Sequence, residues 1–233
     1  MGRTDESYPR FRPVADVGMM VEFGKAISEE VHAAVLALDQ ALAAHPFHGF
    51  TEAVPAYCSL FVAYDPLVAE LKSVKAHVSA LVASMTVSAP KGRLHEIPVC
   101  YDAPFGPDLA SVAERVGLSP EAVIEAHIAG DYRVYMYGFA PGYAYLGGVP
   151  DRIQLPRRPS PIRDIAAGSV LIAGPQCLVT TITMPTGWWI IGRSPAQILR
   201  PQHDVPFLFE VGDRVRFHRV DASHLAMESE VAP

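Results

Sequence analysis

The sequence predicts an α+β protein with two domains of different texture. In the first part of its 233 residues, short apolar runs that suit strands alternate with segments whose apolar residues recur at helical spacing. From Tyr132 onward, short β-type runs are separated by glycine and proline, which is typical of a barrel or a sandwich. The Ala-Pro-Lys-Gly-Arg run that ends residues 86–93 is the best candidate for the boundary. The predicted layout is a tail (1–13), a small α+β domain (14–92), a β-rich domain (93–222) and a second tail (223–233).

The first domain is predicted to contain two strand–helix units. Residues 19–23 and 58–64 are short and apolar, as strands would be. Ser28 suits the N-cap of a first helix, because its hydroxyl can accept a free backbone amide. Asp65-Pro66 predicts the start of a second helix. The apolar stripes of the two helices would be Val31, Val35, Leu38 and Leu42, and Leu67, Leu71, Val74, Val78 and Leu81. Two helices on one sheet in this order predict a split β-α-β arrangement.

The second domain begins with a predicted strand over residues 94–101. Two short helices follow over residues 108–116 and 119–128, with Gly117 between them. Ser119-Pro120 is a strong start signal, since serine caps helices and proline is favoured at their first position. The remaining strands are expected at 134–137, 169–173, 177–184, 188–191 and 214–220. Trp188 and Trp189 are adjacent, so in a strand they would face opposite sides.

Composition excludes several classes of protein. A net charge of −6 argues against a nucleic-acid binder, and no apolar run approaches the roughly 20 residues that span a bilayer. The three cysteines are scattered, without the spacing of a metal site, and they suit reduced thiols in the cytoplasm. No phosphate-binding loop, GxSxG elbow or HExxH motif is present, nor the Met-Lys-Met that would carry biotin. Any nucleotide chemistry therefore requires a site of another kind or a partner chain.

The segment over residues 135–148 is the most informative part of the chain. Its dense glycine, proline and aromatic residues favour the rim of a pocket, although a hairpin packed for structure alone is the alternative. Residues 131–200 hold seven arginines and three aspartates, so this segment carries +4 and the remainder −10. A basic island at such a rim predicts a site for a carboxylate or a phosphate. Arg193, between glycine and Ser194-Pro at a strand end, is a candidate anion clamp, and Gln176 a candidate amide donor.

Several ordered motifs resemble one known family. They are Ile97-Pro-Val-Cys-Tyr, Gly138-Phe-Ala-Pro-Gly-Tyr-Ala-Tyr-Leu-Gly-Gly, Pro156-Arg-Arg, Ile172-Ala-Gly-Pro-Gln and Ile191-Gly-Arg-Ser-Pro. This chain resembles, from about residue 17 to 220, the family of allophanate hydrolase subunit 1, the 5-oxoprolinase B subunit and the histidine-kinase-A inhibitor. The same module forms half of the carboxyltransferase region of urea carboxylase.

The resemblance implies a cyclophilin-like β-barrel as the second domain and a companion subunit of related barrel fold. In the 5-oxoprolinase version, a third lactam-utilisation chain joins them, and a lactam is opened at the expense of ATP with Mg²⁺, which a partner could bind or share. Biotin would not be carried on this chain. The resemblance implies that the following residues bind a small substrate: Gly138, Phe139, Pro141, Gly142, Tyr145, Arg157, Arg158, Gln176 and Arg193. His127, Tyr135 and Ser194 are expected behind them, with no metal ligand and no identified nucleophile or base. Taken alone, His127 is expected to be a residue near a helix end whose hydrogen bonds are satisfied, rather than a base.

One departure from the family pattern affects the expected pocket. After Gln176 the family usually has a Thr-Gly-Ile-Tyr-Pro run and then Ser-Pro-Gly-Gly-Trp, whereas this chain reads Cys-Leu-Val-Thr-Thr-Ile-Thr-Met-Pro-Thr-Gly-Trp. We therefore expect a reshaped pocket or a different substrate. Our leading hypothesis is a cytoplasmic subunit of a heteromeric, ATP-dependent amidohydrolase acting on a lactam or ureido compound. The alternatives are an inhibitor of a sensor histidine kinase and a carboxyltransferase component that uses carboxybiotin supplied by another protein.

Overall fold

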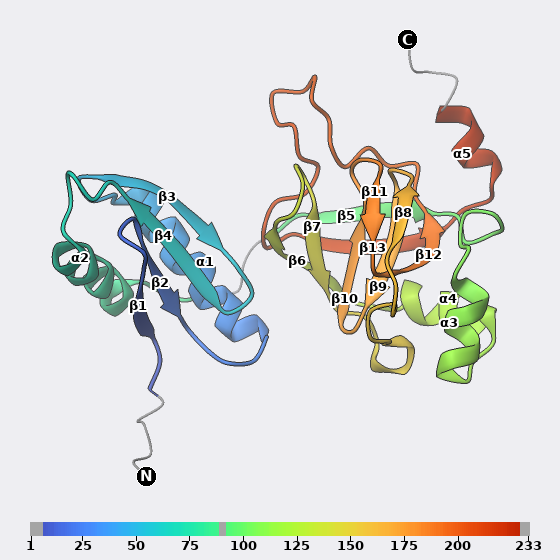
Figure 1. Cartoon of the computed structure of the whole chain (residues 1–233), viewed down its shortest axis with the longest axis horizontal. Helices are drawn as coiled ribbons and strands as arrows, with labels where there is room; N and C mark the ends of the chain where they lie inside the picture. Colours follow the sequence, from blue (N-terminus) through green and yellow to red (C-terminus); the bar gives the residue numbers. More distant parts are fainter. Residues whose placement is uncertain (1–6, 89–91, 229–233) are drawn as a thin grey trace. The chain divides into compact units, whose positions relative to one another are not determined.

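The chain forms two compact units, Met1–Lys91 and Gly92–Pro233 (Figure 1). The computed structural model describes residues 7–88 and 92–228. The predicted boundary segment, 86–93, includes residues 89–91, which lie outside this range, as do residues 229–233 of the predicted C-terminal tail and residues 1–6 of the N-terminal one. Each unit has its own buried apolar cluster, so each is described by itself.

The first unit is a four-stranded sheet with two helices. Its strands are β1 (Arg10–Val14), β2 (Gly18–Glu22), β3 (Phe50–Pro55) and β4 (Ser59–Tyr64), in the spatial order β1-β2-β4-β3. Both β2 and β3 pair with β4 in the antiparallel sense, so they run parallel to each other with β4 between them. The helix α1 (Glu29–Ala44) connects them, and α2 (Leu71–Ser84) follows β4. This is the predicted split β-α-β arrangement.

Apolar burial holds α1 against the sheet. Ser28 caps the helix by accepting a hydrogen bond from the Val31 amide at 3.2 Å, as its sequence position predicts. Val35, Leu38 and Leu42 are fully buried, and they pack in one cluster with residues of β2 and β4. Burying such a side chain contributes about 1.5–3 kcal/mol, so this stripe is the main attachment of the helix.

Two predictions for the first unit are wrong. The N-terminal tail was expected over residues 1–13, but Arg10–Val14 form β1, which pairs with β2 as a hairpin. The second helix does not start at Asp65-Pro66. The Asp65 carboxylate instead accepts a hydrogen bond from the Leu67 amide at 2.9 Å and closes a local turn. The helix therefore starts only at Leu71, and Leu67 is 95% exposed.

The second unit is a nearly closed, barrel-like sheet of seven strands, and the predicted α+β fold class is confirmed. Its spatial order is β12-β9-β10-β7-β6-β13-β5. The bounds are β5 (Leu94–Val99), β6 (Tyr132–Tyr137), β7 (Ala144–Gly147), β9 (Ser169–Ala173), β10 (Gln176–Val179), β12 (Trp189–Arg193) and β13 (Arg214–Arg219). The first of these strands, β5, pairs in parallel with the last, β13, and the two lie side by side in Figure 1.

A single bridge joins the two ends of this sheet. Directly after β5, the Cys100 amide donates to the Arg193 carbonyl, and the Arg193 amide donates to the Cys100 carbonyl, both at 2.8 Å. Arg193 also lies opposite Ser169 of β9. The closing bridge therefore fixes the backbone of an arginine that the sequence singles out.

Opposite faces of the strands belong to two apolar clusters. Trp189 and Ile191 lie in the larger one, with residues of α3 (Leu109–Val116) and α4 (Pro120–Ile128). Trp188 and Ile190 lie in the smaller one, with residues of β8 (Ile162–Ile165) and β11 (Met184–Thr186), which form a separate two-stranded sheet. The two tryptophans thus face opposite sides, as predicted.

The structure also corrects the second unit. The strand expected at 177–184 is divided, because β10 ends at Val179 and β11 starts at Met184. Strands β7 and β8 and the short 3₁₀ helix η1 (Asp151–Ile153) were not predicted. Part of the tail expected over 223–233 is a helix, α5 (Ser223–Glu228). In the described part of the chain, no helix is long and apolar enough to cross a membrane, and no cluster of side chains could hold a metal ion.

Candidate functional site

The glycine- and aromatic-rich segment forms a β-hairpin. Strands β6 and β7 are joined by a loop in which the Gly138 amide donates to the Tyr143 carbonyl at 3.1 Å. Phe139 and Gly142 both have left-handed backbone angles, with φ of 70° and 67°, and the Phe139 residue is 72% exposed. The Thr181 hydroxyl donates to the Pro141 carbonyl at 2.9 Å and ties this loop to the turn after β10. The backbone of residues 135–148 thus forms the hairpin that the sequence analysis gave as the alternative, and the hairpin loop presents an exposed aromatic ring.

Three of the predicted site residues, Phe139, Tyr145 and Arg157, lie along one chain of aromatic contacts. The Phe139 ring lies 5.5 Å from Tyr143, Tyr143 lies 5.3 Å from Tyr145, and Tyr145 lies 5.9 Å from Trp188. The Arg157 guanidinium lies 5.8 Å from the Trp188 ring, within range of a cation–π interaction. The structure therefore brings the hairpin loop, Tyr145 and Arg157 to the same side of the sheet.

Arg158 belongs to a different environment. Its guanidinium pairs with Asp108, just before α3, and lies 4.9 Å from the Trp189 ring. The second oxygen of Asp108 accepts the Ile190 amide at 2.9 Å. The Asp108 carboxylate neutralises Arg158, and the pair joins the start of α3 to β12. Arg158 therefore differs in role from Arg157.

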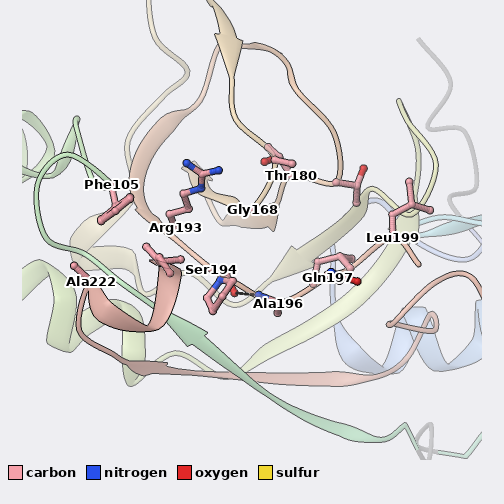
Figure 2. Close-up of a pocket in the computed structure, with 14 residues that line it drawn as sticks. Phe105, Gly168, Thr180, Arg193, Ser194, Ala196, Gln197, Leu199 and Ala222 are labelled. Carbon is pink, nitrogen blue, oxygen red and sulfur yellow. Dashed lines mark hydrogen bonds between the residues drawn. The ribbon is translucent and has the colours of Figure 1, made fainter. Parts of the chain in front are cut away.

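A pocket of about 490 Å³ opens at the end of the barrel where β12 stops (Figure 2). Its walls come from five separate segments of the second unit. The lining residues are Phe105, Ala167, Gly168, Thr180, Thr181, Arg193, Ser194, Pro195, Ala196, Gln197, Ile198, Leu199, Ala222 and Leu225. We call this cavity the Arg193 pocket.

A tight backbone contact builds one wall of the Arg193 pocket. Gly168 has a φ of 80°, and the Ser194 amide donates to its carbonyl at 2.8 Å. A Cβ atom on Gly168 would overlap the Ser194 carbonyl oxygen, so only glycine fits there. Ser194 is buried, and its hydroxyl accepts the Ala196 amide at 3.1 Å. Ser194, which the sequence analysis expected behind the site, is itself one of the lining residues, and its hydroxyl shapes the loop that carries Gln197.

Arg193 gives this pocket its charge. In the part of the chain that the structure describes, no carboxylate pairs with its guanidinium, in contrast to Arg158. Figure 2 shows the guanidinium between Phe105 and Thr180. An arginine remains protonated at any physiological pH, so the pocket can bind an anion.

His127 and Tyr135 serve the core. Tyr135 is 8% exposed and packs against the backbone of Gly147. His127 is fully buried, and burial lowers its pKa to about 3. Its Nδ1 and the Tyr101 hydroxyl share a hydrogen bond of 2.8 Å, while its Nε2 lies 3.5 Å from the Cys177 sulfur. A neutral histidine with both nitrogens engaged is a structural residue, as its lone occurrence predicted.

The sequence missed most of the residues of the Arg193 pocket. Gln176, the amide it proposed, is the first residue of β10, opposite Gly147 and Ala173, and does not line the cavity. Gln197 does line it. The position of residues 196–199 directly after the Gly-Arg-Ser-Pro motif could have pointed to them. They were missed because they match no motif of their own.

The chain is similar to known proteins over most of its length. Residues 9–209 match the family model described as the carboxyltransferase domain, subdomain C and D. The chain is 43% identical over 218 residues to the B subunit of 5-oxoprolinase from Bacillus subtilis (strain 168), with 89% of this chain and 91% of the relative covered. It is 37% identical over 161 residues to the B subunit of 5-oxoprolinase from Haemophilus influenzae, covering 69% of this chain and 72% of that one.

Solved structures show the same fold. The crystal structure of TTHA0988 matches with a TM-score of 0.78 and 38% identity; 88% of this chain is covered, but only 40% of that one, so this chain spans less than half of its length. Kluyveromyces lactis urea carboxylase has a TM-score of 0.75 at 16% identity, covering 93% of this chain and 22% of that one, which bears on the fold alone.

Proposed function

Because the chain belongs to the carboxyltransferase subdomain C and D family, we propose that it is one subunit of a 5-oxoprolinase-type complex. The observation that carries the proposal is the 43% identity to a 5-oxoprolinase B subunit over nearly the full length of both chains. The structure supports it with a pocket that contains an arginine and suits a small organic acid.

The proposed reaction opens the five-membered lactam 5-oxoproline with ATP. An unstrained amide resists hydrolysis, and transfer of the ATP γ-phosphoryl group to the lactam oxygen would turn that oxygen into a leaving group. Water then adds to the ring carbon, the C–N bond breaks and its nitrogen takes a proton, which leaves an acyl phosphate. A second water releases the phosphate from the acyl carbon, so that overall one ATP and two waters give glutamate, ADP and phosphate. The contribution of this chain is to bind and orient a negatively charged group, since preorganised cations stabilise charge that develops during reaction.

We propose that companion subunits supply the rest of the chemistry. In the described residues, the buried His127 is neutral and fully bonded, and burial raises the pKa of the Cys177 thiol, so neither suits a base or a nucleophile. The subunit naming of the relatives fits a multi-chain assembly. The proposal therefore includes a companion barrel subunit, a third lactam-utilisation subunit, ATP with Mg²⁺ bound by or shared with those chains, and a cytoplasmic location.

The test is ATP turnover by this chain purified together with the companion subunits encoded beside it. The expected result is turnover that 5-oxoproline stimulates and that disappears when this chain is omitted. A stable complex without stimulation by 5-oxoproline would reject the lactam, and ureido compounds and carboxybiotin would be tested next. The chain failing to bind any companion would reject the subunit proposal, and inhibition of a sensor histidine kinase would become the leading alternative.

A further inference from the structure

The charges and hydrogen bonds of the Arg193 pocket indicate which of the two proposed substrates it takes. Among the described residues that line it, Arg193 is charged and none is aspartate, glutamate, lysine or histidine. The pocket therefore carries a charge of about +1, which matches one carboxylate. A nucleoside triphosphate carries several negative charges, and known sites for it use Mg²⁺, lysine and a cradle of free backbone amides.

Three backbone amides in the wall beside Arg193 are already committed to hydrogen bonds within the protein. The Gly168 amide donates to the Thr180 carbonyl at 2.8 Å, the Ser194 amide to the Gly168 carbonyl at 2.8 Å, and the Ala196 amide to the Ser194 hydroxyl at 3.1 Å. A glycine turn near an arginine would otherwise be a natural phosphate cradle. With these three amides occupied, the wall favours a carboxylate held by the guanidinium alone.

The position of Arg193 suits that role. Both of its backbone hydrogen-bonding groups are bound to Cys100 at the bridge that closes the barrel, and its strand pairs with β9 on the other side. An arginine side chain on such a fixed backbone loses little freedom on binding, and its planar fork matches the two oxygens of a carboxylate.

The polar side chains that line the pocket leave one group well suited to an amide. The Thr180 hydroxyl donates to the Ala166 carbonyl and the Thr181 hydroxyl to the Pro141 carbonyl, both at 2.9 Å. Gln197, exposed at the other side of the cavity in Figure 2, has a carboxamide with both a donor and an acceptor. A lactam presents the complementary C=O and N–H pair. Phe105, Ile198, Leu199 and Leu225 supply apolar surface for its methylene groups.

Size is compatible with this ligand. At the roughly 30 Å³ that a water molecule takes in the liquid, the nine non-hydrogen atoms of 5-oxoproline would fill at most about 270 Å³. That is a little over half of the 490 Å³ cavity.

We propose that the Arg193 pocket binds the lactam acid and not the nucleotide, with Arg193 binding the carboxylate and Gln197 pairing with the lactam amide. This inference rests on the proposed function and adds to it a division of labour, since ATP then binds outside this pocket. Gln197 becomes a specificity-determining residue that distinguishes a lactam from a plain cyclic acid.

The test measures KM for 5-oxoproline and for MgATP in the assembled complex. Arg193→Gln should raise KM for 5-oxoproline about 10- to 100-fold, the loss expected for a charge-assisted bidentate contact, and should leave KM for MgATP within about twofold. Arg193→Lys, which keeps the charge without the planar fork, should give an intermediate value. The matched control is Arg163→Gln, which changes an exposed arginine of β8 outside the pocket and should change neither constant.

Binding to the full chain separates the two contacts. Arg193→Gln should weaken 5-oxoproline and cyclopentanecarboxylate alike but not 2-pyrrolidone, which has no carboxylate. Gln197→Leu should weaken 5-oxoproline and 2-pyrrolidone by up to about tenfold and leave cyclopentanecarboxylate unchanged. An unchanged KM for 5-oxoproline in Arg193→Gln, or a raised KM for MgATP, would overturn the inference while the proposed function stands.

If the wild-type complex shows no lactam-stimulated turnover, the proposed function fails, and the binding series alone decides the inference. Calorimetric binding of 5-oxoproline to the full chain that Arg193→Gln removes would still assign the pocket. Binding that is absent, or equal in the two proteins, would overturn that assignment.

Discussion

Replacing His127 with phenylalanine should reduce the acid sensitivity of the second unit. Burial lowers the pKa of His127 to about 3, whereas an unfolded chain has a histidine pKa of about 6.5. Below pH 6.5 the unfolded state therefore binds a proton that the folded state does not, and stability falls as the pH falls towards 3. Above pH 6.5 neither state is protonated, so the contribution no longer changes with pH.

The structure sets the size of this effect. Each pH unit below 6.5 costs about 1.4 kcal/mol, which gives about 2.7 kcal/mol at pH 4.5 and a limit of about 5 kcal/mol near pH 3. The neighbouring groups do not titrate in this window, because burial raises the pKa values of Tyr101 and Cys177. Phenylalanine preserves the stacking on Phe217, 4.6 Å away, but leaves the buried Tyr101 hydroxyl without its hydrogen-bond partner. At pH 7.5 we therefore expect His127→Phe to be less stable than wild type by about 1–3 kcal/mol.

The assay is urea unfolding followed by tryptophan fluorescence between pH 7.5 and 4.5. Both tryptophans of the chain, Trp188 and Trp189, belong to the second unit, so the signal reports that unit alone. The wild type should lose about 2.7 kcal/mol more than His127→Phe over this range. The exposed His203 gives a matched control, and His203→Phe should follow the wild-type slope. Parallel slopes for the wild type and His127→Phe would refute the reasoning.

Three further predictions use the same unfolding assay. Gly168→Ala should destabilise the second unit by more than the roughly 1–2 kcal/mol that an alanine costs in a left-handed conformation, because its Cβ would also clash with the Ser194 carbonyl. The control Gly187→Ala, with open space around its Cβ, should change the free energy of unfolding by under about 1 kcal/mol. Equal losses in the two variants would contradict the reasoning. Ser119→Ala should cost about 1 kcal/mol through loss of the α4 cap, whereas Ser119→Asp should retain stability. Asp108→Asn should cost about 2–4 kcal/mol by leaving Arg158 unpaired, and a loss no greater than that of an exposed ion pair would show that the pair does not join α3 to β12.

Local features of the fold could be predicted from the sequence. The caps at Ser28 and Ser119 depend on residues a few positions apart, and both are present in the structure. The same local reasoning was wrong at Asp65, because a carboxylate can close a turn with the next amides as readily as it can start a helix. The strand Arg10–Val14 was missed because its apolar pattern is weak and its stability comes from pairing with β2.

The candidate site was harder to predict because it depends on distant pairings. Arg158 resembled a substrate-binding residue until the fold placed Asp108 beside it, fifty positions earlier in the chain. The sequence correctly placed Arg193 at a strand end, but its freedom from an ion pair in the described structure depends on which acids the barrel brings near. The assignment of the other candidate residues to a substrate stays a prediction.

The strand order of the barrel has a consequence for biosynthesis. Strand β13, at residues 214–219, is inserted between β6 and β5, so the strand made last in this sheet completes the pairing of the strand made first. While the ribosome synthesises the intervening residues, Leu94–Val99 has no neighbouring strand along its length, and its exposed edge can pair with other chains. The first unit can fold as soon as its own residues emerge. The second must wait for almost the entire chain, which makes it the stage at which nascent copies are most exposed to aggregation and to chaperones.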